Sequence, residues 1–206
     1  MRKLIVNEFV SMDGVAQAPG GQEEDPSGGF AHGGWHMRYT QDERARAWVM
    51  EYIADMGALV LGRRTYEIFA GYWPNASEEE AFIAEPLNRV PKHVASTTLT
   101  EPLAWSNSSL LRPDVATALR ALKQKDGRDL HVIGSAQLVR GLLADDLVDE
   151  LRLMIDPLML GGGKRIFPED GELRRFRLAE HEFTNDGAVL ATYSRQREEE
   201  AARDAA

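Results

Sequence analysis

The chain contains no cysteine among its 206 residues. This absence excludes disulfide bonds, thiol nucleophiles and zinc sites with cysteine ligands, including those of cysteine-ligated zinc deaminases. The sequence also lacks an apolar run of the roughly 18 residues that a membrane-spanning helix needs. Its start, MRKLIVNEFV, has neither the long apolar stretch nor the cleavage site of a secretory signal. We therefore expect a cytoplasmic protein that does not bind membranes.

Positive charge is scarce as well, with 24 lysines and arginines against 33 acidic residues and a formal net charge of -9. This balance opposes general binding to nucleic acid, so a site for an anionic ligand has to be a local basic pocket. A hydrophobic content of 43% is enough for one domain with a substantial core. We predict a single domain over residues 1–195 and a solvated tail over residues 196–206.

Strand-like and helix-like segments alternate along most of the chain. Residues 3–10 are β-rich, and a loop rich in glycine and proline follows over residues 11–35. Further strands are expected at 58–62, 92–99, 103–111, 130–134 and 149–160, and helices at 40–56, 63–73, 77–90, 114–125 and 135–146. Residues 176–184 and 188–195 flank Asn-Asp-Gly and predict a hairpin. This order favours a three-layer α/β domain with a mixed sheet.

Small or polar residues follow three of the predicted strands, at 62–65, 96–97 and 134–137. Strand ends of α/β sheets open onto ligand crevices, helix N-termini present free N–H groups, and guanidinium groups match phosphate oxygens. Each segment also has a simpler interpretation, as a capped helix start, a tight turn or hydroxyls facing water. The residues of each segment taken alone do not decide between these interpretations.

Three glycines follow the last long strand in LMLGGGKRIFPED, residues 158–170. A nucleoside-triphosphate loop needs a glycine five residues before the Gly-Lys pair and a hydroxyl after it, but this chain has Leu158 and Arg165 there. The run is therefore not such a loop. Its glycines either turn the chain or let the backbone lie close to another group.

Taken together, these segments make the sequence recognisable. It resembles the dihydrofolate reductase-like superfamily, and most closely the reductase domain of riboflavin-biosynthesis deaminase-reductases and its stand-alone relatives. The segments that carry the resemblance are FVSMDGV (9–15), LGRRTY (61–66), HVIGS (131–135), LVDEL (147–151) with Pro157 and the three glycines, and Phe167. They cover nearly all of the chain up to Arg195.

The resemblance implies an αβα fold around a mixed, mostly parallel sheet of about eight strands that ends in an antiparallel hairpin. It also implies an NADPH-dependent oxidoreductase that transfers hydride to a small planar heterocycle, pteridine- or pyrimidine-like. The implied cofactor contacts are Gly62, Arg63, Arg64 and Thr65 at the diphosphate and adenosine side, with an arginine near the 2′-phosphate; Ser96 and Thr97 at the adenine ribose; Gly134, Ser135, Ala136 and Gln137 at the pyrophosphate; and Val15 beside the nicotinamide.

Asp13 and Trp35 are the candidate catalytic residues. Asp13 would orient the substrate or relay a proton, and Trp35 would stack on a planar ring. An Asp-Gly turn and a plain core tryptophan are the simpler alternatives. His32 and His36 have i, i+4 spacing, but the glycines between them disfavour the helix that a two-histidine metal site needs, and no metal is expected.

The resemblance leaves the substrate open. Riboflavin-pathway reductases usually have a lysine where this chain has Val15, and the carboxylate typical of folate reductases has no clean match after Trp35. A protein that senses or sequesters NADP(H) without chemistry is the alternative function. The resemblance further implies a homodimer.

Overall fold

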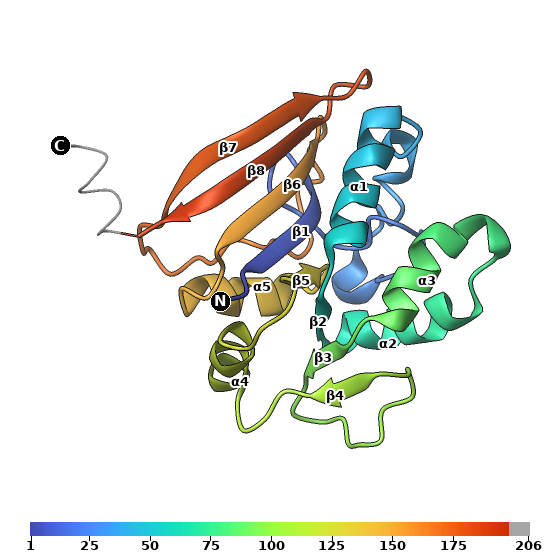
Figure 1. The fold of residues 1–206 in the computed structure, drawn as a ribbon. Coiled ribbons are helices and arrows are strands. Elements are labelled where there is room, and N and C mark those ends of the chain that lie inside the picture. Colours follow the sequence, from blue (N-terminus) through green and yellow to red (C-terminus); the bar gives the residue numbers. More distant parts are fainter. Residues whose placement is uncertain (198–206) are drawn as a thin grey trace.

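The computed structural model describes residues 1–197, which form an eight-stranded sheet with helices on both faces (Figure 1). The strands are β1 (Leu4–Ser11), β2 (Ala58–Gly62), β3 (Lys92–Ala95), β4 (Ser108–Leu110), β5 (Leu130–Ile133), β6 (Glu150–Asp156), β7 (Arg175–Phe183) and β8 (Val189–Gln196). The α-helices are α1 (Glu43–Asp55), α2 (Arg63–Tyr72), α3 (Ala81–Arg89), α4 (Val115–Lys123) and α5 (Ala136–Ala144). Short 3₁₀ helices span Ser27–Gly29, Met37–Tyr39, Trp73–Asn75 and Glu78–Glu80.

The sheet is mixed and mostly parallel, in the order β4-β3-β2-β5-β1-β6-β8-β7. All pairs from β4 to β6 are parallel, and β8 runs antiparallel to both β6 and β7. Helices α4 and α5 cover one face through Leu119, Val139 and Leu142. Helices α1 to α3 cover the other face of β2 and β3 (Figure 1), where Tyr52 and Leu87 are buried. The predicted three-layer fold with a terminal antiparallel hairpin is confirmed.

The connections from the strands diverge in the middle of the sheet. The chain leaving β1 or β2 enters the helical layer of α1 to α3, whereas the chain leaving β4 or β5 enters that of α4 and α5 (Figure 1). Strands β1 and β5 are neighbours, and the chain leaves their carboxyl ends toward opposite faces of the sheet. In open α/β sheets such a divergence leaves a crevice that binds ligands.

Several element boundaries differ from the predicted ones. Helix α1 begins at Glu43 and not at Thr40, because the Asp42 side chain accepts hydrogen bonds from the Arg44 and Ala45 amides and caps the helix there. Pro86 lies inside α3, which continues past it to Arg89. Strand β6 ends at Asp156, short of the predicted residue 160, because the chain leaves the sheet at Pro157.

The C-terminal hairpin is confirmed, with Thr184 Oγ1 accepting from the Ala188 amide across its turn. Strand β8 continues through Gln196, so the sheet includes the first residue of the predicted tail. The rest of that tail, from residue 198, lies outside the described residues. Among residues 1–197, no helix has the length and apolar character needed to cross a bilayer.

Candidate functional site

Two helix N-termini lie side by side at the carboxyl edge of the sheet. Strands β2 and β5 are hydrogen-bonded neighbours, and each leads through a glycine turn into a helix, α2 or α5. The Gly62 amide donates to Ser135 Oγ at 2.9 Å and ties the two turns together. Neither helix has a side-chain cap. Their first-turn N–H groups lack intrahelical partners and form a ready site for an anion.

The turn between β5 and α5 requires glycine at position 134. Gly134 has a φ of +62°, and a Cβ added there would lie 3.1 Å from Thr65 Cγ2. Ser135 follows with a φ of +69°. Ala136 is buried beneath the turn and Gln137 is exposed. The structure therefore brings the segments 62–65 and 134–137 together, as a shared cofactor site requires.

The two arginines at the start of α2 are both half-exposed and both ion-paired. Arg63 binds Glu67 at 3.0 Å, one turn along the same helix. Arg64 binds Asp25 of the loop after β1 at 2.8 Å. An incoming phosphate would therefore replace a carboxylate at either arginine.

The third junction lies at the carboxyl end of β3, next to β2. Ser96 Oγ accepts hydrogen bonds from the Thr98 and Leu99 amides, at 3.2 and 2.9 Å. Thr97 is exposed. Ser96 thus shapes the turn that follows β3.

Asp13 anchors the loop that contains the three glycines. Its carboxylate accepts from Ser11 Oγ at 2.6 Å, from the Leu160 amide at 3.1 Å and from the Gly161 amide at 3.0 Å. Arg165 pairs with it at 3.2 Å. Burial raises the pKa of Asp13, but the hydrogen bonds from Ser11, Leu160 and Gly161 outweigh this and lower it to about 2. Asp13 is therefore an ionised anchor, which suits a positioning role better than proton transfer.

The loop after β1 (residues 12–42, the first loop) and the loop between β6 and β7 (residues 157–174, the glycine loop) lie against each other. Gly163, with a φ of +117°, has Val15 Cγ1 at 2.8 Å and Phe30 Cε2 at 2.9 Å from the position a Cβ would take. Its glycine identity is therefore required for this contact. Val15 is fully buried beneath the glycine loop.

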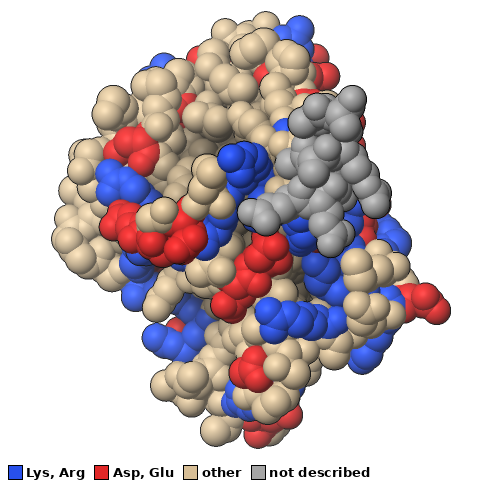
Figure 2. All heavy atoms as spheres, turned by 90° about the vertical axis from the view of Figure 1, so that its left-hand side faces the viewer, with Lys and Arg blue, Asp and Glu red and all other residues tan. Residues whose placement is uncertain are grey.

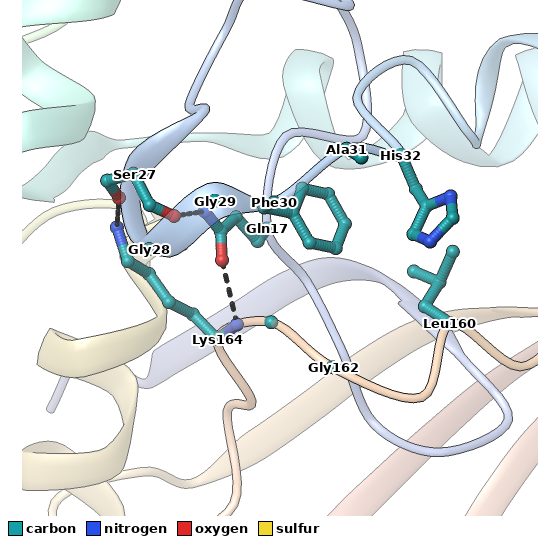
Figure 3. Close-up of a pocket in the computed structure, with 11 residues that line it drawn as sticks. Gln17, Ser27, Gly28, Gly29, Phe30, Ala31, His32, Leu160, Gly162 and Lys164 are labelled. Atoms are coloured by element: carbon teal, nitrogen blue, oxygen red, sulfur yellow. Dashed lines mark hydrogen bonds between the residues drawn. The ribbon is translucent and has the colours of Figure 1, made fainter.

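The two loops enclose a hollow of about 430 Å³ (Figure 3). Its walls come from the first loop (Gln17 and residues 27–32) and from the glycine loop (Leu160 and residues 162–164). The Gln17 amide group joins the loops by donating to the Asp25 and Ser27 carbonyls and accepting from the Lys164 amide. The Lys164 ammonium binds Asp25 at 2.5 Å and Ser27 Oγ at 2.8 Å. Asp25 thus joins the glycine loop to the start of α2.

Trp35 is 9% exposed and donates its indole N–H to the Gln17 carbonyl at 2.8 Å. The next residue, His36, is 3% exposed and stacks on Phe9 with ring centroids 3.8 Å apart. Its Nδ1 lies 2.8 Å from Oδ2 of Asp156 at the end of β6. Burial raises the pKa of Asp156 even though His36 lowers it. Through these contacts Trp35 and His36 hold the first loop in its position.

The sequence did not single out Asp25, the pair of His36 and Asp156, or Glu8, an acidic residue buried in β1. One available signal was the polar pair Asn7-Glu8 inside an otherwise apolar strand, since buried polar side chains are uncommon. The other contacts join segments far apart in the chain and had no local signal. Within residues 1–197, no three histidine or acidic side chains are grouped to hold a metal ion.

Comparison with known proteins gives one family match, to the RibD C-terminal domain, over residues 2–190. The protein YyaP of Bacillus subtilis is 22% identical over 198 residues, which is 93% of this chain and 94% of that protein. The 2,5-diamino-6-ribosylamino-4(3H)-pyrimidinone 5′-phosphate reductase of Archaeoglobus fulgidus is 33% identical over 87 residues, which is 41% of this chain and 40% of the reductase.

Solved structures share the fold. A riboflavin biosynthesis protein described as putative, from Shewanella sp. PV-4, superimposes with a TM-score of 0.67 at 22% identity, over 95% of this chain and 99% of that one. The two-activity protein of Thermotoga maritima, a diaminohydroxyphosphoribosylaminopyrimidine deaminase and 5-amino-6-(5-phosphoribosylamino)uracil reductase, has a TM-score of 0.62 at 16% identity. This chain spans 57% of that longer protein.

Proposed function

Because the chain belongs to the RibD C-terminal domain family, a family of dihydrofolate reductase-like reductase domains, we propose that it is an NADPH-dependent reductase of a small pyrimidine-like heterocycle. The observation that carries the proposal is the pair of uncapped helix N-termini joined by Gly62 and Ser135, beside Arg63 and Arg64. This arrangement fits a pyrophosphate in contact with backbone amides, and a 2′-phosphate in contact with guanidinium groups.

In this proposal bound NADPH supplies the hydride, and the chain supplies binding, orientation and exclusion of water. The turn at Gly134 and Ser135 holds the pyrophosphate, and the start of α2 selects the additional phosphate. The first loop and the glycine loop cover the reacting end and form the hollow for the substrate (Figure 3). The pyrimidine compounds named for the Archaeoglobus and Thermotoga reductases are the first substrates to test.

The cofactor preference is tested by replacing Arg63 and Arg64 together with alanine. Loss of a charge-assisted contact weakens NADPH by about 1.5 to 3 kcal/mol. NADH lacks the 2′-phosphate, so its affinity stays nearly constant. The NADPH-to-NADH affinity ratio should narrow about ten-fold or more in calorimetric titrations. An unchanged ratio, or a wild-type protein that binds neither cofactor, contradicts the proposed site.

Turnover separates the reductase from the alternative, a protein that senses or sequesters NADP(H). NADPH oxidation should accompany addition of 5-amino-6-(5-phosphoribosylamino)uracil or of 2,5-diamino-6-ribosylamino-4(3H)-pyrimidinone 5′-phosphate. Tight NADPH binding without oxidation on these compounds or on a panel of related pyrimidines and pteridines favours the sensor.

We also propose a homodimer formed at the β7 side of the sheet. Strand β7 is an edge strand with exposed Leu178 and Phe183. Positive and negative side chains lie side by side on the face seen in Figure 2. A two-fold interface brings the same patch of both subunits together, so a patch with charges of both signs can pair with its own copy. Light scattering that gives the 23.0 kDa monomer mass at micromolar concentration contradicts this proposal.

A further inference from the structure

Glu8 is a carboxyl group buried in the centre of the sheet. It lies in β1, is 4% exposed, and its Oε1 has no hydrogen-bond partner within residues 1–197. Leaving a buried polar atom unpaired costs stability, and such atoms are uncommon in folded proteins. A ligand that supplies the missing partner would remove this cost.

The position of Glu8 is the crevice between β1 and β5. The pairing of these strands ends at Asn7 and Ile133, whereas β1 continues beside β6 as far as Ser11. Glu8 is therefore the first residue of β1 beyond the end of β5, where the Gly134 turn begins. The Gly134 backbone N–H is close enough to stabilise the carboxylate form of Glu8. The Glu8 carboxyl, whose Oε1 has no partner within residues 1–197, thus adjoins the turn assigned to the cofactor pyrophosphate.

The titratable groups that act on Glu8 come from the two elements packed over this crevice. Glu24 of the first loop and Tyr52 of α1 lie close enough to Glu8 for charge on one group to act on the other. Burial raises the pKa of Glu8 well above its usual value, and the charge of Glu24 raises it further. The pKa of Tyr52 is raised too, by burial and by Glu8, so the phenol stays neutral. Two neighbouring carboxyl groups in a buried site do not both ionise readily, which favours the protonated form of Glu8.

The other acidic and imidazole groups nearby are already in use. Asp13 is ionised and holds the glycine loop. His36 and Asp156 bind each other. His131 lies within hydrogen-bond distance of Asn7 inside the sheet, and burial lowers its pKa to about 4, so it is neutral and not a proton donor near neutral pH. Asp156 Oδ1 also lacks a partner within residues 1–197, but Oδ2 of the same carboxyl binds His36, which lowers the pKa of Asp156. Among these groups, Glu8 is the one at the end of the β1–β5 pairing, beside the Gly134 turn.

We propose that Glu8 is the catalytic proton donor of the reduction. This inference rests on the proposed function. As the substrate carbon of a C=N or C=O bond gains a hydride from the reduced nicotinamide, the π electron pair moves to the nitrogen or oxygen. Glu8 gives its proton to that atom and becomes a carboxylate, leaving the reduced substrate and the oxidised nicotinamide. Water then returns a proton to Glu8.

The protonation of Glu8 is measured without cofactor or substrate. Infrared spectra of the protein at neutral pH contain a C=O stretching band from protonated carboxyl groups, which ionised carboxylates lack. Glu8→Gln keeps the shape of the side chain and removes one contribution to this band, so the spectrum of wild type minus variant isolates Glu8 from Glu24 and Asp156. Glu23→Gln, in the exposed part of the first loop, is the matched control and leaves the band unchanged.

Kinetics test the transfer itself. Single-turnover NADPH oxidation with the two pyrimidine compounds should be about 100-fold slower in Glu8→Gln, as expected for loss of a positioned acid. The wild-type rate should fall as pH rises through the pKa of Glu8, because deprotonation removes the donor, and this alkaline limb should vanish in Glu8→Gln. Glu24→Gln preserves an acceptor for the Gly20 and Gly21 amides but removes the neighbouring charge, so the limb should move to lower pH.

The outcomes separate this inference from the proposed function. If both compounds are reduced but Glu8→Gln keeps the rate and the alkaline limb, Glu8 is not the donor and the reductase stands. If the difference spectrum shows no protonated carboxyl, the assignment fails whatever the turnover. A protein that binds NADPH and reduces nothing overturns the proposed function and, with it, the role of Glu8. Glu8→Gln could instead lower the rate, leave the alkaline limb of the pH–rate profile at the same pH, and weaken NADPH binding two-fold or more. This result indicates a structural role for Glu8 and also overturns the assignment.

Discussion

The two sides of the crevice are built from different kinds of contact. On the side of β2, β3 and β5, short turns place Gly62, Ser96 and Gly134 at neighbouring strand ends, and backbone geometry defines the site. On the side of β1 and β6, two long loops are held by side-chain contacts between distant segments, such as Asp13 with Arg165 and His36 with Asp156. The first side suits a constant ligand such as a cofactor, and the second can vary with the substrate.

The largest effect is expected from His36→Ala on the loop side. The variant leaves Asp156 buried with neither oxygen paired, because Oδ1 already lacks a partner within the described residues. Removing one member of a buried pair costs about 3 kcal/mol or more. Urea unfolding measures the loss. His32→Ala, at an exposed position of the same loop, should change stability by less than about 0.5 kcal/mol. Equal effects of the two substitutions would show that the buried pair does not hold the loop.

Asp13→Asn should have the next largest effect, about 2 kcal/mol, because it removes charge-assisted hydrogen bonds to the glycine loop. The folded-state pKa of Asp13 is about 2, below its usual 3.8. Its contribution is therefore fully present above the usual pKa and disappears as pH falls through the folded value. The free energies of unfolding of the wild type and of Asp13→Asn should therefore converge in this acid range. Asp186→Asn, in the exposed hairpin turn, is the control. A stability difference between the wild type and Asp13→Asn that does not depend on pH would contradict the role of Asp13 as an ionised anchor.

On the cofactor side, Gly134→Ala should cost about 1 to 2 kcal/mol, because the added Cβ is strained at a positive φ. Contact with Thr65 Cγ2 adds to this cost. We expect weaker NADPH binding in calorimetric titrations together with a lower midpoint of thermal unfolding. Gly141→Ala, with open space around its Cβ in α5, should instead stabilise by about 0.5 to 1 kcal/mol. Unimpaired NADPH binding by Gly134→Ala would separate this turn from the cofactor site.

The smallest effect concerns Asp25, which connects the two sides through Arg64 and Lys164. If its carboxylate competes with a cofactor phosphate, Asp25→Asn should tighten NADPH binding by about two- to five-fold, the range of a partly exposed ion pair. The gain should shrink at high salt because screening weakens these charges. Asp126→Asn, which makes the same charge change on an exposed turn, is the control. Weaker binding in Asp25→Asn would mean that Asp25 supports the site.

The sequence by itself determined the alternation of strands and helices, the terminal hairpin and the glycine turns at Gly62 and Gly134, because apolar periodicity and turn chemistry act over a few residues. Tertiary structure alone decided that Arg64 meets Asp25, that His36 reaches Asp156 across 120 residues, and that the buried Glu8 lies beside Gly134. These pairings depend on the order of strands in the sheet and on how two long loops pack over it. No local preference of the chain encodes either of them, so the turns at Gly62 and Gly134 could be predicted from the sequence, whereas the contacts that join the two loops could not.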